Sequence, residues 1–467
     1  MKSNCEKIEE NKVKLTIEVD EEQVEDALEK AYNKVKKQVN IPGFRKGKVP
    51  RKILEQKFGP EVLYEEALEY IVPNAYREAV QENEIEPVAQ PEIDVIEIEK
   101  GSPCKFTATV LVKPKVELGE YKGVEAEKEK VEISEEDVEA KLKETQEKHA
   151  EYEKVDDGEA EMGDRLVIDF KGYLNGEAFD GGEAENYNIE LGAGQLVPGF
   201  EEELVGLKTG DEKEINIKMP EDYGNEELAG QEVVFEVKVN EIKKKKLLPL
   251  DDDFAKDVSE FDTLEELKED IRNKLVESAE QQAHNSVEEQ VIAKVTENAE
   301  VNIPEPMIDQ EADRMVGEFE QNLRAQGLDL EKYYKLSGTD KESFKEQFKG
   351  SAEGRVKTQQ VLEAIVEEEG IEASDDEVTE EINRIAEMHN QEPEQIRTVL
   401  EAQGQLDMLK KEKALRKAIE FLVEKAEVKE VDPEEKKKEA EEAEANEESE
   451  AADKKTESAE NVDSKDS

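Results

Sequence analysis

The sequence predicts a multidomain α+β protein, with a small α+β domain first, a mostly antiparallel β domain carrying one short helix second, and an all-helical domain last. The length of 467 residues exceeds what one ordinary hydrophobic core organises. The apolar periodicity changes along the chain, from mixed to strand-like with frequent glycine, and then to helical. Charged residues make up 40% of the chain and apolar residues only 36%, so we expect part of it to be thinly packed or extended.

Residues 1–112 are predicted to form the small α+β domain. Apolar and polar residues alternate in three segments, which predicts half-buried strands over residues 12–19, 92–98 and 105–112. Helical spacing of apolar residues predicts one helix over 24–39 and a second helical region over 50–81. We expect the second region to be interrupted at Gly59-Pro60 and again near Pro73.

The β domain is predicted over residues 151–245, where glycine is dense. Four strand-like runs occur there, namely RLVIDFKGYL, NYNIEL, EKEINIKM and EVVFEVKVNEIK. The short helix is expected to begin near Pro198. Residues 113–150 are interpreted as a linker, in which Ser134 and Asp137 match a capping pattern for a polar helix through His149.

Residues 246–430 are predicted to be all helical, and Ser374 with Glu377 forms a second capping box. Two apolar stripes stand out there, formed by Val356, Val361, Leu362, Ile365 and Val366 and by Val378, Ile382, Ile385 and Met388. Residues 431–467 form a tail that we expect to be disordered. From residue 432 on, the tail has 15 acidic and 6 basic residues, a net charge of −9.

Composition excludes several function classes. The net charge of −59 argues against broad binding to nucleic acid or to anionic membranes, since both require a basic surface. Cys5 and Cys104 are isolated, and His149, His284 and His389 lie far apart, so we predict no disulfide framework, no metal and no cofactor. No stretch approaches the ~20 apolar residues of a membrane span, and the start has no apolar run of the signal-peptide type. We therefore expect a cytoplasmic protein.

One short region departs from this acidic character. Residues 34–57 contain nine Lys and Arg against one acidic residue, a local charge of +8. Within this region Phe44 directly precedes Arg45 and Lys46 in a glycine-containing loop, so an apolar ring is displayed among cations. Charge alone would be explained equally well by a solvated face without a partner. The exposed ring favours a contact surface, because an aromatic side chain fills a pocket while cations meet phosphates or carboxylates.

The run GFRKGKVP over residues 43–50 resembles the ribosome-docking signature of the trigger factor family. The resemblance implies that Phe44, Arg45 and Lys46 contact a ribosomal protein and nearby rRNA of the large subunit, beside the exit of the nascent chain. It extends from about Lys12 to Val428, and implies that the helical region forms extended arms around a cradle that binds nascent and unfolded polypeptides. A homodimer away from the ribosome stays open.

Four motifs in the β domain are similar to those of FKBP-type peptidyl-prolyl isomerases. They are Ile168-Asp169-Phe170-Lys171-Gly172, Phe179-Asp180-Gly181, the run GQLVPGF over 194–200, and Phe235 on the last strand. The resemblance implies an FKBP-like antiparallel β fold whose proline pocket is lined by Phe170, Phe179, Tyr187, Val197, Phe200, Tyr223 and Phe235, with Asp180 at its rim. Small FKBPs usually carry Trp where this chain has Phe200, so we expect altered ligand affinity rather than lost activity.

Isomerisation of an X-Pro bond needs no nucleophile. Rotation breaks amide resonance against a barrier of ~18–20 kcal/mol. Because the twisted amide has less charge separation than the planar one, a dry aromatic pocket favours it relative to water. Periodicity alone would sooner assign these aromatic residues to an ordinary core, and it is the family resemblance that favours the isomerase.

A phosphate-binding loop is a weaker interpretation of Gly192-Ala193-Gly194. The third glycine of such a motif would fall at Val197, and Pro198 follows, so no nucleotide site is predicted.

Three other functions fit parts of the sequence. A plain FKBP-type isomerase with dimerisation or targeting flanks leaves the basic loop unexplained. A periplasmic chaperone with parvulin-type isomerase units would need a signal peptide. An RNA-binding assembly factor predicts affinity for naked rRNA with a steep salt dependence, whereas basic residues confined to one loop predict a shallow one.

Overall fold

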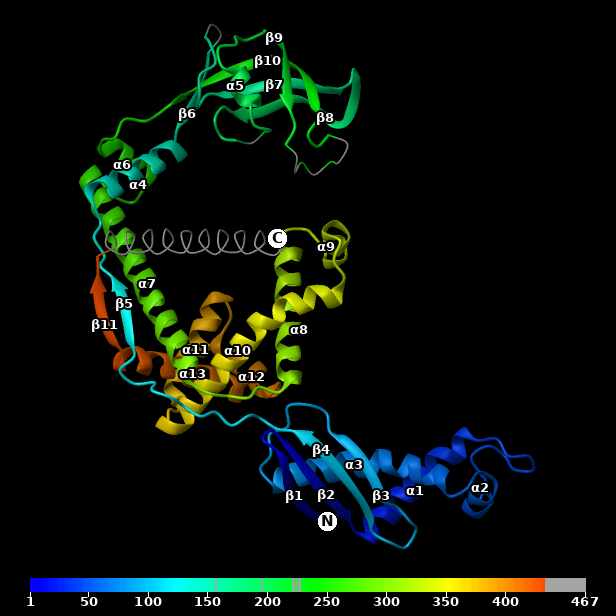
Figure 1. Cartoon of the computed structure of the whole chain (residues 1–467). Helices are drawn as coiled ribbons and strands as arrows, with labels where there is room; N and C mark the ends of the chain where they lie inside the picture. The colour runs from blue at the N-terminus through cyan, green and yellow to red at the C-terminus, as the bar shows by residue number, and fades with distance from the viewer. Residues whose placement is uncertain (156–157, 195, 221–222, 224, 226–227, 433–467) are drawn as a thin grey trace, which may run out of the picture. The chain divides into compact units, whose positions relative to one another are not determined.

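The computed structural model describes residues 1–155, 158–194, 196–220, 223, 225 and 228–432, and its helices and strands are drawn in Figure 1. The chain divides into two compact units, one of Met1–Glu129 with His284–Ser467 and one of Lys130–Ala283. The predicted acidic tail lies outside the described residues from 433 on. The elements within the described ranges confirm the multidomain α+β fold class.

The first unit begins with a four-stranded antiparallel sheet in the order β1-β2-β4-β3. Its strands are β1 (Lys2–Glu9), β2 (Lys12–Val19), β3 (Glu92–Glu97) and β4 (Cys104–Leu111). Helices α1 (Glu21–Gln38) and α3 (Glu61–Glu82) pack on one face, where Leu15, Leu28 and Phe106 join one core (Figure 1). Strand β1 was not predicted because it buries almost no side chain and is held by backbone pairing with β2.

The predicted break near Pro73 is wrong. Helix α2 (Arg51–Phe58) does end at Gly59, as predicted, but α3 continues through Pro73 without interruption. A proline inside a helix costs ~3 kcal/mol. Residues at a spacing of four along α3 are all buried in the core, namely Leu63, Ala67, Ile71, Ala75 and Ala79. Burial of this stripe outweighs the local cost of the proline.

The two free thiols differ in environment, and we expect them to differ in reactivity. Cys104 is fully buried at the start of β4, and burial raises the pKa of its thiol to about 11, whereas Cys5 is exposed on β1. Only the thiolate reacts, so at about pH 8 a thiol reagent should label one thiol per native chain and two per denatured chain. Cys5→Ser should remove the rapid reaction; equal rates for both native thiols would contradict the buried position of Cys104.

The second unit contains the predicted β domain. Its sheet has five strands. Four of them pair in the order β6-β10-β7-β8, and the fifth, β9, pairs with β10. They are β6 (Glu151–Val155), β7 (Arg165–Leu174), β8 (Glu177–Glu190), β9 (Glu212–Lys218) and β10 (Glu232–Lys246). The one short helix expected near Pro198 is α5 (Phe200–Leu204), and its Phe200 and Leu204 are buried in the core of the domain.

The segment 113–150, interpreted as a linker, carries regular structure. Helix α4 (Glu135–Lys148) begins with the predicted capping box, in which Ser134 N donates to Asp137 Oδ2 at 2.9 Å. Val138 and Leu142 of α4 are buried in one cluster with Phe254 of helix α6 (Asp252–Val258). The strand β5 (Glu125–Glu129) pairs in parallel with β11 (Glu427–Val431), and neither of these highly charged strands was predicted.

The remaining elements are helical, as predicted. They are α7 (Leu264–Asn298), α8 (Glu305–Ala325), α9 (Leu330–Ser337), α10 (Lys341–Glu369), α11 (Asp375–Met388), α12 (Pro393–Ala402) and α13 (Leu406–Lys425). The capping box at Ser374 is present, and the stripe on α10 is largely buried. The second stripe needs correction, because Met388 is 65% exposed and Ala386 is buried instead. None of the helices in the described ranges is long and apolar enough to cross a membrane.

Candidate functional site

The β domain brings five aromatic rings together from four elements. Phe170 of β7 lies at their centre, with its ring centroid 5.7 Å from Tyr187, 6.0 Å from Phe200 and 6.2 Å from Phe235. Phe235 of β10 lies 5.3 Å from Phe200 and 6.1 Å from Phe179. All five pairs meet edge to face, an arrangement that aromatic rings favour.

These rings differ in burial in the way that a pocket requires. Phe200 is 1% exposed and Phe235 is also buried, so both belong to the floor. Phe170, Phe179, Tyr187 and Val197 are half-buried and pack against this floor. The half-buried side chains therefore keep part of their apolar surface accessible to solvent, whereas Phe200 and Phe235 are enclosed.

One predicted pocket residue, Tyr223, is not brought into this cluster, and a second, Asp180, is not described in its side chain. Tyr223 is exposed, and its ring contacts no aromatic ring among the described residues. Asp180 lies in β8, but its side chain is outside what the structure describes.

Two glycines make room for the ring of Phe179. A Cβ atom on Gly172 would lie 2.5 Å from Phe179 Cε1 and 2.8 Å from Phe235 Cε1. A Cβ atom on Gly182 would also meet the Phe179 ring at too short a distance. Gly172 belongs to a motif that the sequence analysis identified, but Gly182 was not predicted. The only sign in the sequence that Gly182 matters is that it follows Gly181 of another motif.

A bulge in β8 orients the next part of the wall. Asn186 has a left-handed φ of +53°, and its N–H donates to Asp169 Oδ1 at 2.6 Å. This hydrogen bond, with one from the Asn240 side chain, lowers the pKa of the Asp169 carboxyl. The bulge precedes Tyr187, which pairs with Ile168 of β7. Asp169 therefore holds the segment that presents the Tyr187 ring.

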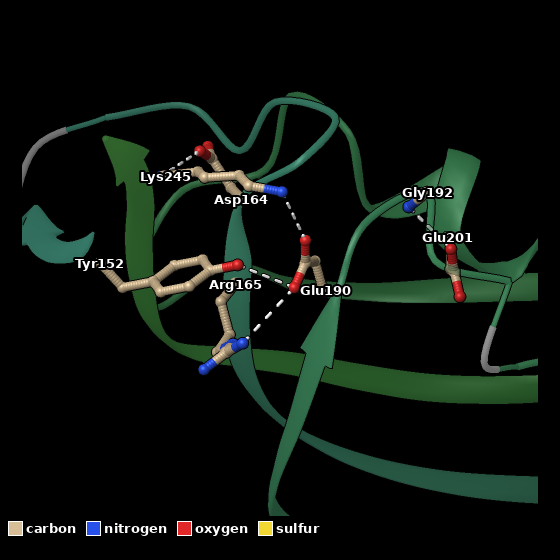
Figure 2. A network of polar contacts seen from close by, with 7 residues as sticks. All are labelled: Tyr152, Asp164, Arg165, Glu190, Gly192, Glu201 and Lys245. Atoms are coloured by element: carbon tan, nitrogen blue, oxygen red, sulfur yellow. Dashed lines mark hydrogen bonds and ion pairs between the residues drawn. The ribbon is translucent and has the colours of Figure 1, made fainter. Parts of the chain in front are cut away.

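A polar network ties four strands together at one end of the sheet, as Figure 2 shows. Glu190 Oε2 accepts a hydrogen bond from Tyr152 Oη at 2.8 Å, and Glu190 Oε1 one from Lys245 Nζ at 3.0 Å. Arg165 donates to Glu190 at 3.4 Å and stacks on the Tyr152 ring at 4.0 Å. Burial and the hydrogen bond to Glu190 raise the pKa of Tyr152. None of these residues was singled out from a sequence in which two residues in five are charged.

A hollow of about 780 Å³ borders Phe170 and is lined mostly by charged side chains of β7, β8, β9 and β10. Two of its lysines are neutralised, because Lys171 pairs with Glu183 at 3.0 Å and Lys238 with Glu212 at 2.8 Å. A hollow lined mostly by charged groups does not favour a twisted amide over a planar one. The aromatic pocket is therefore the candidate for prolyl chemistry.

The basic loop of the first unit is anchored at both ends and exposed between them. Ile41 and Val49 are buried, and the Tyr32 hydroxyl donates to Val49 O at 2.7 Å. Gly47 N donates to Lys36 O at 2.9 Å and ties the loop to the last turn of α1. Phe44 stays 39% exposed. The loop thus presents its aromatic ring to solvent.

The nine cations of this region are not equivalent. Arg51 pairs with Glu25 at 2.8 Å and with Glu55 at 2.7 Å, and Lys34 pairs with Glu66 and Glu69. Arg45 and Lys46 are exposed and make no ion pair within the part of the chain that the structure describes. Seven of the nine cations thus make no ion pair among the described residues, and three of these seven, Arg45, Lys46 and Lys48, lie in the same loop as Phe44.

The C-terminal helices expose several large apolar side chains. Leu336 of α9 is 83% exposed, and Met388, Val399 and Met408 on α11, α12 and α13 are exposed as well. Single exposed apolar side chains are normal on a protein surface, so these residues gain weight only from the family resemblance stated for this region; methionine adapts to varied partners. The sequence alone identifies no binding residue here, because apolar residues on a helix are usually core.

An FKBP-like aromatic pocket, joined in one chain to an α+β domain with a cationic loop and to helices with exposed apolar residues, defines a chaperone of the isomerase-containing class. Family models agree: the bacterial trigger factor protein model matches residues 1–145, the FKBP-type peptidyl-prolyl cis-trans isomerase model 156–240, and the trigger factor C-terminus model 263–424.

Trigger factors are also the known proteins that this chain resembles over most of its length. The trigger factor of Natranaerobius thermophilus is 64% identical over 92% of this chain and 97% of its own length. That of Shouchella clausii is 50% identical over 93% of this chain and 100% of its own. A solved trigger factor chaperone matches with a TM-score of 0.51 and 25% identity, covering 91% of this chain and 99% of that chain.

The chain belongs to the trigger factor family. It is a molecular chaperone with peptidyl-prolyl cis-trans isomerase activity, which confirms the family and the activity predicted from the motifs.

Proposed function

We propose that X-Pro bonds isomerise in the aromatic pocket, with the proline ring on the floor of Phe200 and Phe235. The observation that carries the proposal is the closed floor under half-buried rings. Phe170, Phe179 and Tyr187 form the walls, and Val197 contributes apolar surface from the loop before α5. Asp180 at the rim and Tyr223 rest on the family resemblance alone.

The pocket acts by preferring the twisted amide. A dry aromatic environment stabilises it relative to the charge-separated planar amide, and no covalent intermediate is needed. A rate gain of roughly 10⁶ requires about 8 kcal/mol of such differential stabilisation. The test is the rate of a proline-limited refolding reaction with variants of the floor.

The Gly172→Ala substitution should slow isomerisation without touching the substrate. The new methyl group would overlap the rings of Phe179 and Phe235, so at least one of them must move. Misplacement by about 1 Å costs up to roughly a hundredfold in rate, and we expect kcat/KM to fall by about tenfold or more. Gly354→Ala in α10, where a Cβ atom meets nothing within 4 Å, is the matched control and should leave the rate unchanged.

We further propose that Phe44, Arg45 and Lys46 dock the chain onto the large ribosomal subunit beside the exit of the nascent chain. The exposed ring and two cations without an ion pair support this, because Phe fills a protein pocket while Arg and Lys meet rRNA phosphates or acidic side chains. A cytoplasmic location follows from the proposal. Co-sedimentation of the purified chain with vacant ribosomes tests it.

The exposed apolar residues of the C-terminal helices support the proposal that nascent and unfolded polypeptides bind there. On this proposal the ribosome-binding segment 1–112, the isomerase segment 151–245 and the helical segment 246–430 act as separate functional parts. A homodimer away from the ribosome stays a proposal that sedimentation velocity of the purified chain tests.

A further inference from the structure

Glu201 is a buried carboxylate beside the pocket that the isomerase chemistry does not use. It is the second residue of α5 and is only 5% exposed. Its Oε2 atom accepts hydrogen bonds from Gly192 N at 2.8 Å and from Gly194 N at 3.1 Å, and Oε1 accepts one from Leu196 N at 3.4 Å. Figure 2 shows the carboxylate facing Gly192. Burial of a carboxylate is costly unless donors compensate its charge, so these amides and the side chain form one arrangement.

The backbone of the loop is shaped to bring its N–H groups to one point. Gly192 and Gly194 have φ values of +93° and +65°, a left-handed conformation that favours glycine. Successive N–H groups turned to the same side form an anion-binding concavity. The likeness of Gly192-Ala193-Gly194 to a phosphate loop therefore has a physical basis, but the anion in this loop is the chain's own Glu201.

The loop held in this way is part of the pocket wall. It connects the end of β8 to α5 and carries Leu196 and Val197, which pack against the core that contains Phe200. Glu201 directly follows Phe200, whose ring is the floor. Two adjacent residues thus fix two sides of the pocket, one through its ring and the other through the loop amides.

We propose that Glu201 is a positioning residue for prolyl isomerisation: its carboxylate clamps the amides of Gly192, Gly194 and Leu196 and thereby holds the wall that carries Val197 over the Phe200 floor. The inference rests on the proposed aromatic pocket. It assigns the loop a fixed conformation before substrate arrives, so that the apolar wall does not have to be ordered during each turnover.

Three variants of the full chain test the clamp. Glu201→Ala removes the acceptors, and Glu201→Gln keeps the side-chain volume and one acceptor oxygen but turns an N–H₂ donor toward the loop donors. Glu202→Ala, at the exposed neighbouring position, is the matched control for loss of one carboxylate. We measure kcat/KM in proline-limited refolding, and hydrogen exchange of peptides covering residues 191–200, β7 and β10.

We expect kcat/KM to fall by about tenfold to a hundredfold in Glu201→Ala, by less in Glu201→Gln, and not at all in Glu202→Ala. Hydrogen exchange in 191–200 should accelerate in the same order while β7 and β10 stay protected. Unchanged exchange in the loop, unchanged kcat/KM, or equal loss of protection throughout β7 and β10 in both Glu201 variants would overturn the clamp.

The Phe200→Leu variant distinguishes failure of the Glu201 clamp from failure of the pocket proposal. If Phe200→Leu loses isomerase activity while Glu201→Ala keeps it, the pocket stands and only the clamp is wrong. If Phe200→Leu also keeps full activity, the pocket proposal fails first.

Discussion

The triple variant Phe44→Ala, Arg45→Ala, Lys46→Ala is expected to lose co-sedimentation with ribosomes, with at least about a hundredfold loss of affinity. An aromatic or arginine anchor at the centre of an interface contributes about 2 kcal/mol or more, and two such anchors exceed the 2.8 kcal/mol that corresponds to a hundredfold. The fold should survive, because the loop is anchored by buried Ile41 and Val49, which remain. Isomerase activity should be intact, since the pocket lies in the other compact unit.

A matched control separates the loop from the basic region as a whole. Lys52, Lys57 and Phe58 of α2 offer one exposed aromatic ring and two exposed cations in the same domain. Replacing these three by alanine removes the same charge and a ring of the same kind, and should leave most of the ribosome affinity. Equal losses in the two triple variants would show that general positive charge, not the loop tip, makes the contact; no loss in the first would contradict docking.

The elements that the sequence predicts well are those whose own side chains go into a core. Strand β2 alternates buried Leu15 and Ile17 with neighbours that are less buried, and the cap of α4 is a local Ser134–Asp137 interaction. Both can therefore be predicted without knowing which element packs against them. Strand β1 exists through backbone pairing that leaves no side-chain pattern. The continuity of α3 through Pro73 depends on the packing of its buried residues in the core of the domain. The helix propensities of its own residues do not predict this packing.

The same distinction applies to the site. The rings of Phe170, Phe200 and Phe235 could be predicted because each stands in a short motif similar to a known family. Glu201 could not, because one carboxylate among 124 acidic residues has no distinguishing mark until its contacts with the loop amides are known. Its role depends on the left-handed conformation of Gly192 and Gly194. The sequence shows these glycines but not the direction in which their N–H groups point.

Phe200→Leu is expected to slow catalysed isomerisation by about tenfold or more while the domain stays folded. Leucine keeps an apolar side chain in the core and leaves a smaller gap than Phe200→Ala, which would cost about 3–5 kcal/mol. The substitution removes the edge-to-face contacts with Phe170 and Phe235 and leaves a gap in the floor. Proline-limited refolding measures the rate, and suppression of aggregation of an unfolded protein measures chaperone action in parallel.

Phe254→Leu supplies the matched control, because Phe254 is as deeply buried in the same unit but belongs to the cluster of α4 and α6. Phe254→Leu should lower the free energy of unfolding by a similar amount and leave the rate of isomerisation unchanged. A slower rate in Phe200→Leu alone would then be due to the pocket. Aggregation suppression should persist in both variants, since the exposed apolar residues Leu336 and Met388 lie on other helices. Loss of both activities in Phe200→Leu alone would mean that unfolded chains and proline substrates share one surface, so that the pocket itself captures clients.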